Sequence, residues 1–257
     1  MKYLKLFEQF EEGHKFDILD LFTIHPKEVE ELFFEEIKKE TPDIENIKIF
    51  LDSGIVNVNS RYRYGDLTPL HMAAWRNSLE VAEFLISSGA DLEAKDRWIR
   101  VSLHLAVEWN SLEVAQLLIS SGAEVSAVDK RNRTPLHDVT ITGNQNLAKL
   151  LISSGADLDA KDEDGETPLH FTARNNCLGI AKLLISSGAN LEVKDEDGWT
   201  PLHRAARVNS VPLAEFLISS GAVVNAKDNS GLTPLKLAIR NDSIEVADLL
   251  TNNGGVR

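Results

Sequence analysis

The apolar positions that follow Thr167 have the spacing of a short helix. Leu169 and Ala173 lie four residues apart and give the segment one small apolar face. Thr167 is a helix-capping residue type, and Pro168 fits the first helical position because its missing N–H needs no partner there. The pattern therefore predicts a short first helix, which ends at the polar pair Asn175-Asn176.

A second helical pattern runs from about Leu178 to Ser187. Its inward positions recur at helical spacing, at Ile180, Ala181, Leu184 and Ile185. Gly188 fits the left-handed residue that commonly ends a helix. Residues 190–194 are predicted to be extended, and residues 195–198 (Asp-Glu-Asp-Gly) are typical of a turn. One unit is therefore two helices followed by a turn, which leads to the next Thr-Pro pair.

This unit recurs along the chain. Its phrase Thr-Pro-Leu-His begins at Thr68, Thr134, Thr167 and Thr200, with degraded forms at Val101 and Thr233, and all six starts are 33 residues apart. A second phrase, Ile-Ser-Ser-Gly-Ala, keeps the same step from Ile86, Ile119, Ile152, Ile185 and Ile218, and becomes Thr251-Asn252-Asn253-Gly254-Gly255 in the last unit. Repetition at a fixed period of this length is typical of stacked repeat proteins.

The units resemble the ankyrin-repeat family through Thr-Pro-Leu-His, the Gly-Ala after the second helix and the Asp-x-x-Gly turn. The resemblance covers about Tyr62 to Arg257. It implies an all-α repeat fold, an ankyrin solenoid of helix–turn–helix units whose β-turn fingers project at one side beside a concave groove. Since a single unit cannot bury its apolar face, stability is expected to come from stacking between neighbours.

Three regions are predicted. Residues 1–25 are expected to form an acidic, helical cap or appended element. Residues 26–61 are predicted to be a divergent first repeat, with helices over about Lys27 to Lys39 and Ile44 to Gly54. Residues 62–257 are predicted to hold six repeats of 33 residues, the last of them a truncated cap with a more polar outer face.

Composition narrows the function classes. The net charge of −13 argues against nucleic acid as a partner, because the chain as a whole repels phosphates. A single cysteine excludes an internal disulfide and indicates a reducing compartment. No apolar stretch is long enough for a membrane span, and the first residues lack the core of a signal peptide. We expect a monomeric cytoplasmic protein with no membrane contact; a nucleus, or a host cytosol for a secreted effector, stays an alternative.

The residues that resemble catalytic groups have structural explanations. His71, His104, His137, His170 and His203 all stand in the Thr-Pro-Leu-His phrase, where the resemblance implies that the imidazole binds backbone groups of a neighbouring turn. Cys177 shares its position with Ser78, Ser111, Asn144, Ser210 and Ser243, which are residue types that begin a helix. The sequence therefore predicts no catalytic residue, no cofactor and no metal site.

Positions that do not repeat are free of the demands of stacking. By the resemblance, the finger tips and the ends of the first helices line the concave side. Basic and aromatic residues gather there, and we predict that they bind a partner: Arg61, Tyr62, Arg63, Tyr64, Trp75, Arg76, Arg97, Trp98, Arg100, Trp109, Lys130, Arg131, Arg133, Trp199, Arg204 and Arg207. Ile99 replaces a turn glycine and Val101-Ser102 replaces Thr-Pro, so a distorted finger is expected there.

These residues favour a non-catalytic scaffold that binds another protein, through an acidic or extended segment, along the groove. A second hypothesis is a sensor of nucleotides or other phosphorylated small ligands, held between fingers by tryptophan and arginine. A third is a rigid spacer in an assembly.

Overall fold

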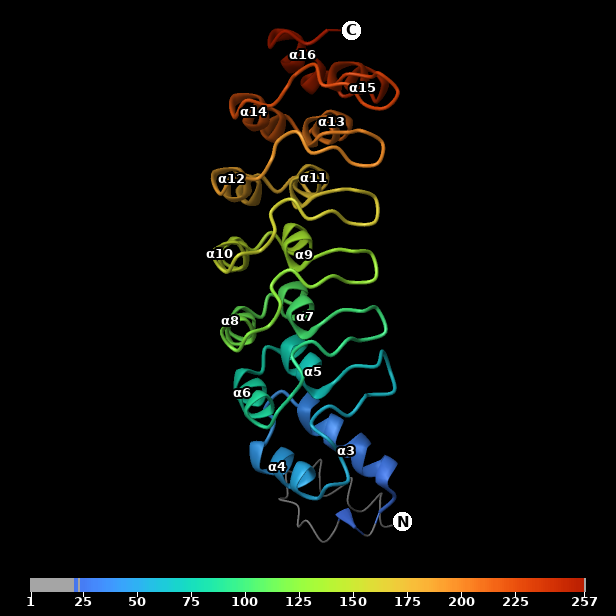
Figure 1. The fold of residues 1–257 in the computed structure, drawn as a ribbon, viewed down its shortest axis with the longest axis vertical. Helices are drawn as coiled ribbons and strands as arrows, with labels where there is room; N and C mark the ends of the chain where they lie inside the picture. Colours follow the sequence, from blue (N-terminus) through green and yellow to red (C-terminus); the bar gives the residue numbers. More distant parts are fainter. Residues whose placement is uncertain (1–20, 23, 257) are drawn as a thin grey trace. The chain divides into compact units, whose positions relative to one another are not determined.

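The computed structural model describes residues 21, 22 and 24–256, and this part of the chain contains fourteen α-helices and no β-strand. The predicted all-α repeat fold is confirmed. The helical element expected within residues 1–25 lies almost wholly outside the described residues. The chain divides into two compact units, residues 1–124 and 125–257, and in each unit the helices pair side by side while loops project from one edge as fingers (Figure 1).

In the first unit, each repeat contributes one pair of helices. The pairs are α3 (Pro26–Lys38) with α4 (Ile44–Asp52), α5 (Pro69–Arg76) with α6 (Leu79–Ser87), and α7 (Ser102–Glu108) with α8 (Leu112–Ser120). The first helix of a repeat contacts the first helix of the next, as α5 contacts α7, and the second helices stack in the same way. Two columns of helices result.

The second unit repeats this arrangement with four pairs. They are α9 (Pro135–Thr142) with α10 (Gln145–Ser153), α11 (Pro168–Arg174) with α12 (Leu178–Ser186), α13 (Pro201–Arg207) with α14 (Val211–Ser219), and α15 (Pro234–Arg240) with α16 (Ile244–Asn252). Helix α12 ends one residue before the predicted Ser187, and Gly188 has the expected positive φ of 100°. Each buried leucine in these columns contributes about 2 kcal/mol through removal from water.

The pair of α3 and α4, which the sequence predicts to be a divergent first repeat, builds its core differently from the regular repeats. Helix α3 is longer than the other first helices and buries Phe33 and Phe34, with Phe33 packed edge-on against Phe50 of α4 at 5.8 Å between ring centroids. The carboxylate of Glu36 is fully buried and accepts hydrogen bonds from the backbone N–H of Asp43 at 2.8 Å and the side chain of Asn46 at 3.3 Å. Glu36 therefore joins the two helices of this pair.

Buried histidines connect four of the regular repeats to the next finger. In each Thr-Pro-Leu-His phrase the backbone N–H of the threonine donates to Nδ1 of the histidine, so the neutral ring carries its proton on Nε2. That Nε2 donates to a backbone carbonyl 29 residues ahead, at 2.9–3.2 Å: His71 to Arg100, His137 to Glu166, His170 to Trp199 and His203 to Leu232. The role that the family resemblance implied for these histidines is confirmed.

A buried aspartate shapes each of the five fingers that follow the first one. Its Oδ1 accepts the backbone N–H groups two and four residues ahead, and its position recurs at Asp96, Asp129, Asp162, Asp195 and Asp228. Neighbouring fingers are also joined through their backbones, as in the bond from Arg97 N–H to Gly65 carbonyl at 2.9 Å in the first unit. The fingers are therefore hydrogen-bonded at every turn that the structure describes.

The finger at residues 96–100 is not distorted, contrary to the sequence-based expectation. Ile99 N–H donates to Asp96 carbonyl at 3.0 Å, the same distance as from Asn132 to Asp129 in the finger at residues 129–133. Ile99 also takes the left-handed conformation of the glycine that it replaces, with φ of 63°. Isoleucine in place of glycine at position 99 therefore leaves the shape of the turn unchanged but puts backbone strain into it.

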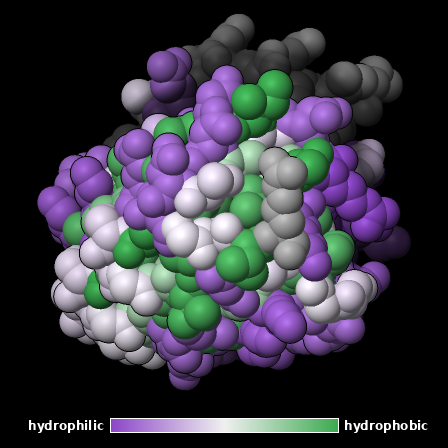
Figure 2. All heavy atoms as spheres, turned by 90° about the horizontal axis from the view of Figure 1, so that it is seen from above, coloured by the Kyte–Doolittle hydropathy of each residue, from purple (hydrophilic) through white to green (hydrophobic). Residues whose placement is uncertain are grey.

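The end of the second unit that carries α15 and α16 presents apolar side chains among hydrophilic ones (Figure 2). Ile239, Ile244 and Val256 are exposed there. Among the described residues, no helix is both long enough and apolar enough to cross a membrane.

The buried histidines predict a stability that falls in mild acid. Burial lowers the pKa of His71, His137 and His203, and lowers the pKa of His170 to about 4, while the bonds to backbone carbonyls oppose the shift. The unfolded chain, with histidines near pKa 6.5, then binds more protons than the folded chain as the pH falls from about 6.5 towards 4, so the free energy of unfolding rises with pH in that window.

Urea unfolding followed by circular dichroism should show this loss. His170 alone should contribute about 1 kcal/mol between about pH 7.5 and about pH 5.5, and a His170→Gln variant should lose that part of the slope. A free energy of unfolding that stays constant or rises as the pH falls over this range would contradict the assignment.

Candidate interaction surface

The first finger, residues 61–67, is closed by its own backbone and by Arg61. Tyr62 N–H donates to Leu67 carbonyl at 2.8 Å, which makes an isolated antiparallel bridge. The guanidinium of Arg61 donates to the carbonyl of Asp66 at 3.0 Å and to the carbonyl of Lys95 in the next finger. One guanidinium nitrogen of Arg61 therefore joins two fingers of the first unit.

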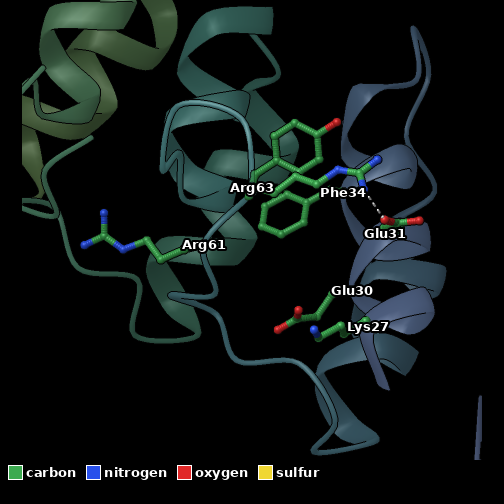
Figure 3. A pocket seen from close by; sticks show the side chains of 7 residues that line it. Lys27, Glu30, Glu31, Phe34, Arg61 and Arg63 are labelled. Carbon is green, nitrogen blue, oxygen red and sulfur yellow. Dashed lines mark ion pairs between the residues drawn. The ribbon is translucent and has the colours of Figure 1, made fainter. Parts of the chain in front are cut away.

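Tyr62 anchors this finger on α3. Its ring packs against Phe34 at 5.1 Å between centroids, and its hydroxyl accepts a hydrogen bond from Lys38 Nζ at 2.8 Å. Beside these rings lies a pocket of about 310 Å³, lined by Lys27, Glu30, Glu31, Phe34, Arg61, Tyr62 and Arg63. Figure 3 shows Arg63 reaching across to Glu31 on α3, with a nitrogen–oxygen distance of 2.9 Å, whereas Arg61 points away from the pocket.

Tyr64 and Trp98 extend the aromatic surface from the first finger to the second. Tyr64 is 62% exposed, and its ring lies 4.8 Å from the guanidinium carbon of Arg63. Trp98 is 46% exposed and lies against Gly65, where an added methyl group would stand 3.4 Å from the indole ring. A methyl group would therefore fit in contact with the indole, and it is the φ of 86° that favours glycine at this position.

Two arginines flank the Trp98 ring but differ in what else they contact. Arg97 lies 5.3 Å and Arg100 lies 4.8 Å from the ring centroid. Arg100 also donates two hydrogen bonds to Asp96 Oδ2, at 2.9 and 3.0 Å, and pairs with Glu108 at 2.6 Å. Arg97 makes no ion pair with any described residue. Arg100 is therefore part of the finger's structure, while the charge of Arg97 is available to a partner.

A second aromatic pair stands where the first helices end. Trp75, in the last turn of α5, and Trp109, directly after α7, lie 5.7 Å apart between ring centroids at a tilt of 56°. Trp109 is 53% exposed. Arg76 lies 5.1 Å from the Trp75 ring and, like Arg97, has no ion pair within the described part of the chain. The predicted residues of the first unit thus form aromatic groups with arginine beside them.

The predicted residues Lys130, Arg131 and Arg133 belong to the second unit. Arg133 donates to Asp129 Oδ2 at 2.9 and 3.2 Å, which repeats the bond that Arg100 makes to Asp96. Although burial opposes it, hydrogen bonds from the backbone and side chain of Arg133 lower the pKa of Asp129. Arg131 is exposed and lies 3.4 Å from Glu163 in the next finger. Of these three residues, Arg133 is the one built into a turn.

Trp199 joins two fingers of the second unit. Its indole Nε1 donates to Asp228 Oδ2 at 3.0 Å, and the guanidinium carbons of Arg204 and Arg207 lie 4.6 and 5.3 Å from its ring. Arg204 in turn donates to Asp195 Oδ2 at 2.9 Å. Trp199 is therefore half-buried and hydrogen-bonded, unlike the exposed Trp98 and Trp109.

Acidic side chains meet next to this tryptophan. Oxygens of Asp162, Asp164 and Glu166 lie within 4.8 Å of one another. Glu166 is buried, which raises its pKa, and Arg204 and Arg174 oppose that shift at 2.7 and 3.2 Å. The Arg204–Glu166 contact is an ion pair whose alignment falls outside that of a hydrogen bond. Two guanidinium groups thus hold the place that a cation would need beside Glu166.

Cys177 stands half-buried at the start of α12. Burial raises the pKa of its thiol, and the backbone N–H of Ile180 opposes that shift. A thiol with a raised pKa is a poor nucleophile at neutral pH.

Comparison with known proteins agrees with this architecture. The family profile "Ankyrin repeats (3 copies)" matches residues 103–195 and 187–256, and the profile "Ankyrin repeat" matches residues 65–97. Over 53 residues the chain is 43% identical to the protein named Palmitoyltransferase AKR1 from Naumovozyma castellii, which is 21% of this chain and 7% of that protein. Over 57 residues it is 44% identical to Serine/threonine-protein kinase 12 from Arabidopsis thaliana, which is 22% of this chain and 12% of that one. The similarity therefore covers a small part of either relative.

Charge reversal at the two arginines of finger 96–100 should have unequal effects on stability. Arg100→Glu should lower the free energy of unfolding by about 2–3 kcal/mol, because it removes both ion pairs and sets a third carboxylate beside the buried Asp96. Arg97→Glu makes the same change of charge three residues away and should alter it by less than about 0.5 kcal/mol. Urea titrations at matched pH compare the two variants, and equal losses would refute the structural role of Arg100.

Proposed function

Because this chain belongs to the ankyrin-repeat family, whose repeats are protein-interaction modules, we propose that it is a non-catalytic scaffold that binds an acidic, extended segment of another protein. The binding surface of this proposal, the Trp–Arg surface, consists of Tyr64, Trp75, Arg76, Arg97, Trp98 and Trp109 in the first unit.

One observation carries the proposal: Arg97 stands beside the exposed Trp98, and Arg76 stands beside the Trp75–Trp109 pair, and neither arginine is neutralised by a described acidic side chain. Trp98 and Trp109 are about half exposed, and Arg76 and Arg97 make no ion pair among the described residues. Tryptophan, tyrosine and arginine are the residue types that dominate the energetics of protein interfaces. A guanidinium held over an indole presents its donors to a planar anion, and a carboxylate fits that geometry.

The charge of the chain favours a protein segment over nucleic acid. A duplex presents a continuous row of phosphates, and affinity for it grows with the number of cations that contact it. The Trp–Arg surface offers two arginines without ion pairs, within a chain of net charge −13. This inventory suits a few carboxylates that alternate with other side chains.

Rigidity supports binding to this surface. Residues that carry the rings lie directly beside the fixed turns: Trp98 N–H donates to Asp96 Oδ1 at 2.8 Å, and the histidine of α5 holds Arg100 carbonyl at 3.0 Å. A surface that is held before the partner arrives loses less conformational entropy on binding.

Fluorescence anisotropy with two labelled peptide pools of about 12 residues tests the proposal. One pool contains Asp, Glu, Ser and Gly, and the other contains Lys, Arg, Ser and Gly. The protein should bind the acidic pool, more weakly as salt is added. Arg76→Glu with Arg97→Glu should weaken that binding at least about tenfold, since each reversal sets like charges together.

A matched control separates a site from the general field of the protein. Lys149→Glu with Lys182→Glu makes the same change of net charge on the exposed sides of α10 and α12 in the second unit. Its binding should stay close to that of the wild type. An equal loss in both double variants, or binding of the basic pool alone, would refute the proposed surface.

A further inference from the structure

The turn of each finger contains a residue in the left-handed conformation at the same position, and finger 96–100 fills that position in an unusual way. Six fingers place these residues there, with φ between 56° and 81°: Asp66, Ile99, Asn132, Gly165, Gly198 and Gly231. Glycine adopts this conformation freely, and asparagine and aspartate tolerate it. A β-branched side chain is strained in it. Ile99 is the one β-branched residue with a positive φ in the described part of the chain.

Surrounding hydrogen bonds hold Ile99 in this conformation. Its N–H donates to Asp96 carbonyl, and Asp96 Oδ1 accepts from the residues on either side of it, Trp98 at 2.8 Å and Arg100 at 2.9 Å. The isoleucine therefore cannot relax to a negative φ without breaking this set. Strain of this kind persists where the surroundings impose it, and it gathers at functional positions.

The same repeat departs from the others in two further ways. Val101 has no hydroxyl, whereas the threonine at the same position of four other repeats lies 2.7–3.0 Å from Nδ1 of its histidine. The hydroxyls of Ser102 and Ser111 are buried without a hydrogen-bond partner. Both departures weaken this repeat. The repeat that carries Trp98 and Trp109 thus lacks hydrogen bonds that the other repeats have.

Trp98 and Ile99 form an exposed apolar tip on this weakened repeat. Trp98 is 46% exposed, Ile99 is 40% exposed, and Arg97 stands directly beside them with no ion pair among the described residues. A glycine or asparagine would satisfy the turn and leave this tip polar, as in the other fingers. The fold of the finger therefore does not require the isoleucine side chain at position 99. Because this side chain is exposed, a contact with another molecule explains its presence.

We propose that Ile99 is a specificity-determining residue of the Trp–Arg surface: with Trp98 it contacts an apolar side chain of the bound segment, while Arg97 contacts a carboxylate next to that side chain. This inference rests on the proposed function and names the class of segment that it accepts, an apolar residue flanked by Asp or Glu. The strain at Ile99 is retained because its side chain contributes to binding.

Two sets of substitutions distinguish the proposed contact of Ile99 with the bound segment from the effect of Ile99 on stability. Ile99→Gly and Ile99→Asn install the residues that other fingers use at this position, so they relieve the strain and remove the apolar side chain together. Val101→Thr with Ser102→Pro restores the usual helix start of this repeat at buried positions and leaves the tip unchanged. Both sets should raise Tm by about 2 °C or more.

Binding should divide the two sets. The probes are the acidic peptide pool and an otherwise identical pool with Leu, Ile or Phe at its central position. The wild type and the Val101→Thr/Ser102→Pro variant should prefer the pool with the apolar residue by about tenfold. Ile99→Gly and Ile99→Asn should bind both pools alike, although they are more stable than the wild type, so unfolding cannot explain the loss.

Three results would overturn the inference. One is an unchanged preference in Ile99→Gly, and another is a Tm that does not rise in either Ile99 variant. The third is a mass in light scattering that grows with concentration and that Ile99→Gly abolishes, which would assign the tip to a second copy of the chain. If Arg76→Glu with Arg97→Glu leaves binding of the acidic pool unchanged, the proposed function itself fails, and that outcome is distinct from the other three.

Discussion

The structure depends on a hydrogen bond that joins a regular repeat to the finger after it: in four repeats the histidine Nε2 donates to a backbone carbonyl 29 residues ahead. The bond can form because the capping threonine donates its N–H to Nδ1, which leaves the proton on Nε2. It connects the start of a first helix to the last residue of the next turn. A buried aspartate then closes that turn from inside. Neither bond depends on what the finger presents to solvent.

Because these bonds do not involve the exposed side chains, a framework that repeats can present surface residues that do not repeat. The turn does not use the second oxygen of the finger aspartate, and in four fingers this oxygen accepts a hydrogen bond from a different residue: Arg100 at Asp96, Arg133 at Asp129, Arg204 at Asp195 and the indole of Trp199 at Asp228. Some residues that do not repeat therefore belong to the framework. The others, with Trp98, Arg97 and Ile99 foremost, are left exposed at the tips and give the proposed surface its chemistry.

The sequence predicted the fold well because the repeating residues act locally. Helix α11 begins at Pro168, as the Thr-Pro pair predicts, and α12 ends one residue before the predicted Ser187. Such bounds can be predicted because the capping of a helix depends on the nearest few residues. The histidine contacts were implied by the family resemblance, which carries long-range information that spacing alone lacks. The buried Glu36 of the divergent repeat had no such guide, because its partners Asp43 and Asn46 become neighbours only once α3 and α4 pack.

The candidate site was harder to predict because residues of one type play two roles. Arg97 and Arg100 are three positions apart and look alike in the sequence. Only the closed turn shows that a residue four positions after the aspartate can reach its second oxygen, whereas a residue one position after it cannot. The structural role of Trp199 is also hidden in the sequence, because its hydrogen-bond partner Asp228 lies in the next finger. A rule follows for the basic fingers: the arginine four residues after a finger aspartate is structural.

The four tryptophans allow one direct measurement of the central claim, that a partner binds the Trp–Arg surface of the first unit. Each tryptophan gives one indole N–H signal in a nitrogen-15 NMR spectrum, and single Trp→Phe variants assign the four signals. On addition of the acidic peptide pool, the account predicts that the signals of Trp75, Trp98 and Trp109 shift together with one affinity, while that of Trp199, bound to Asp228 beneath Arg204, stays in place. A shift of the Trp199 signal alone, or no shift in any of the four, would contradict the account.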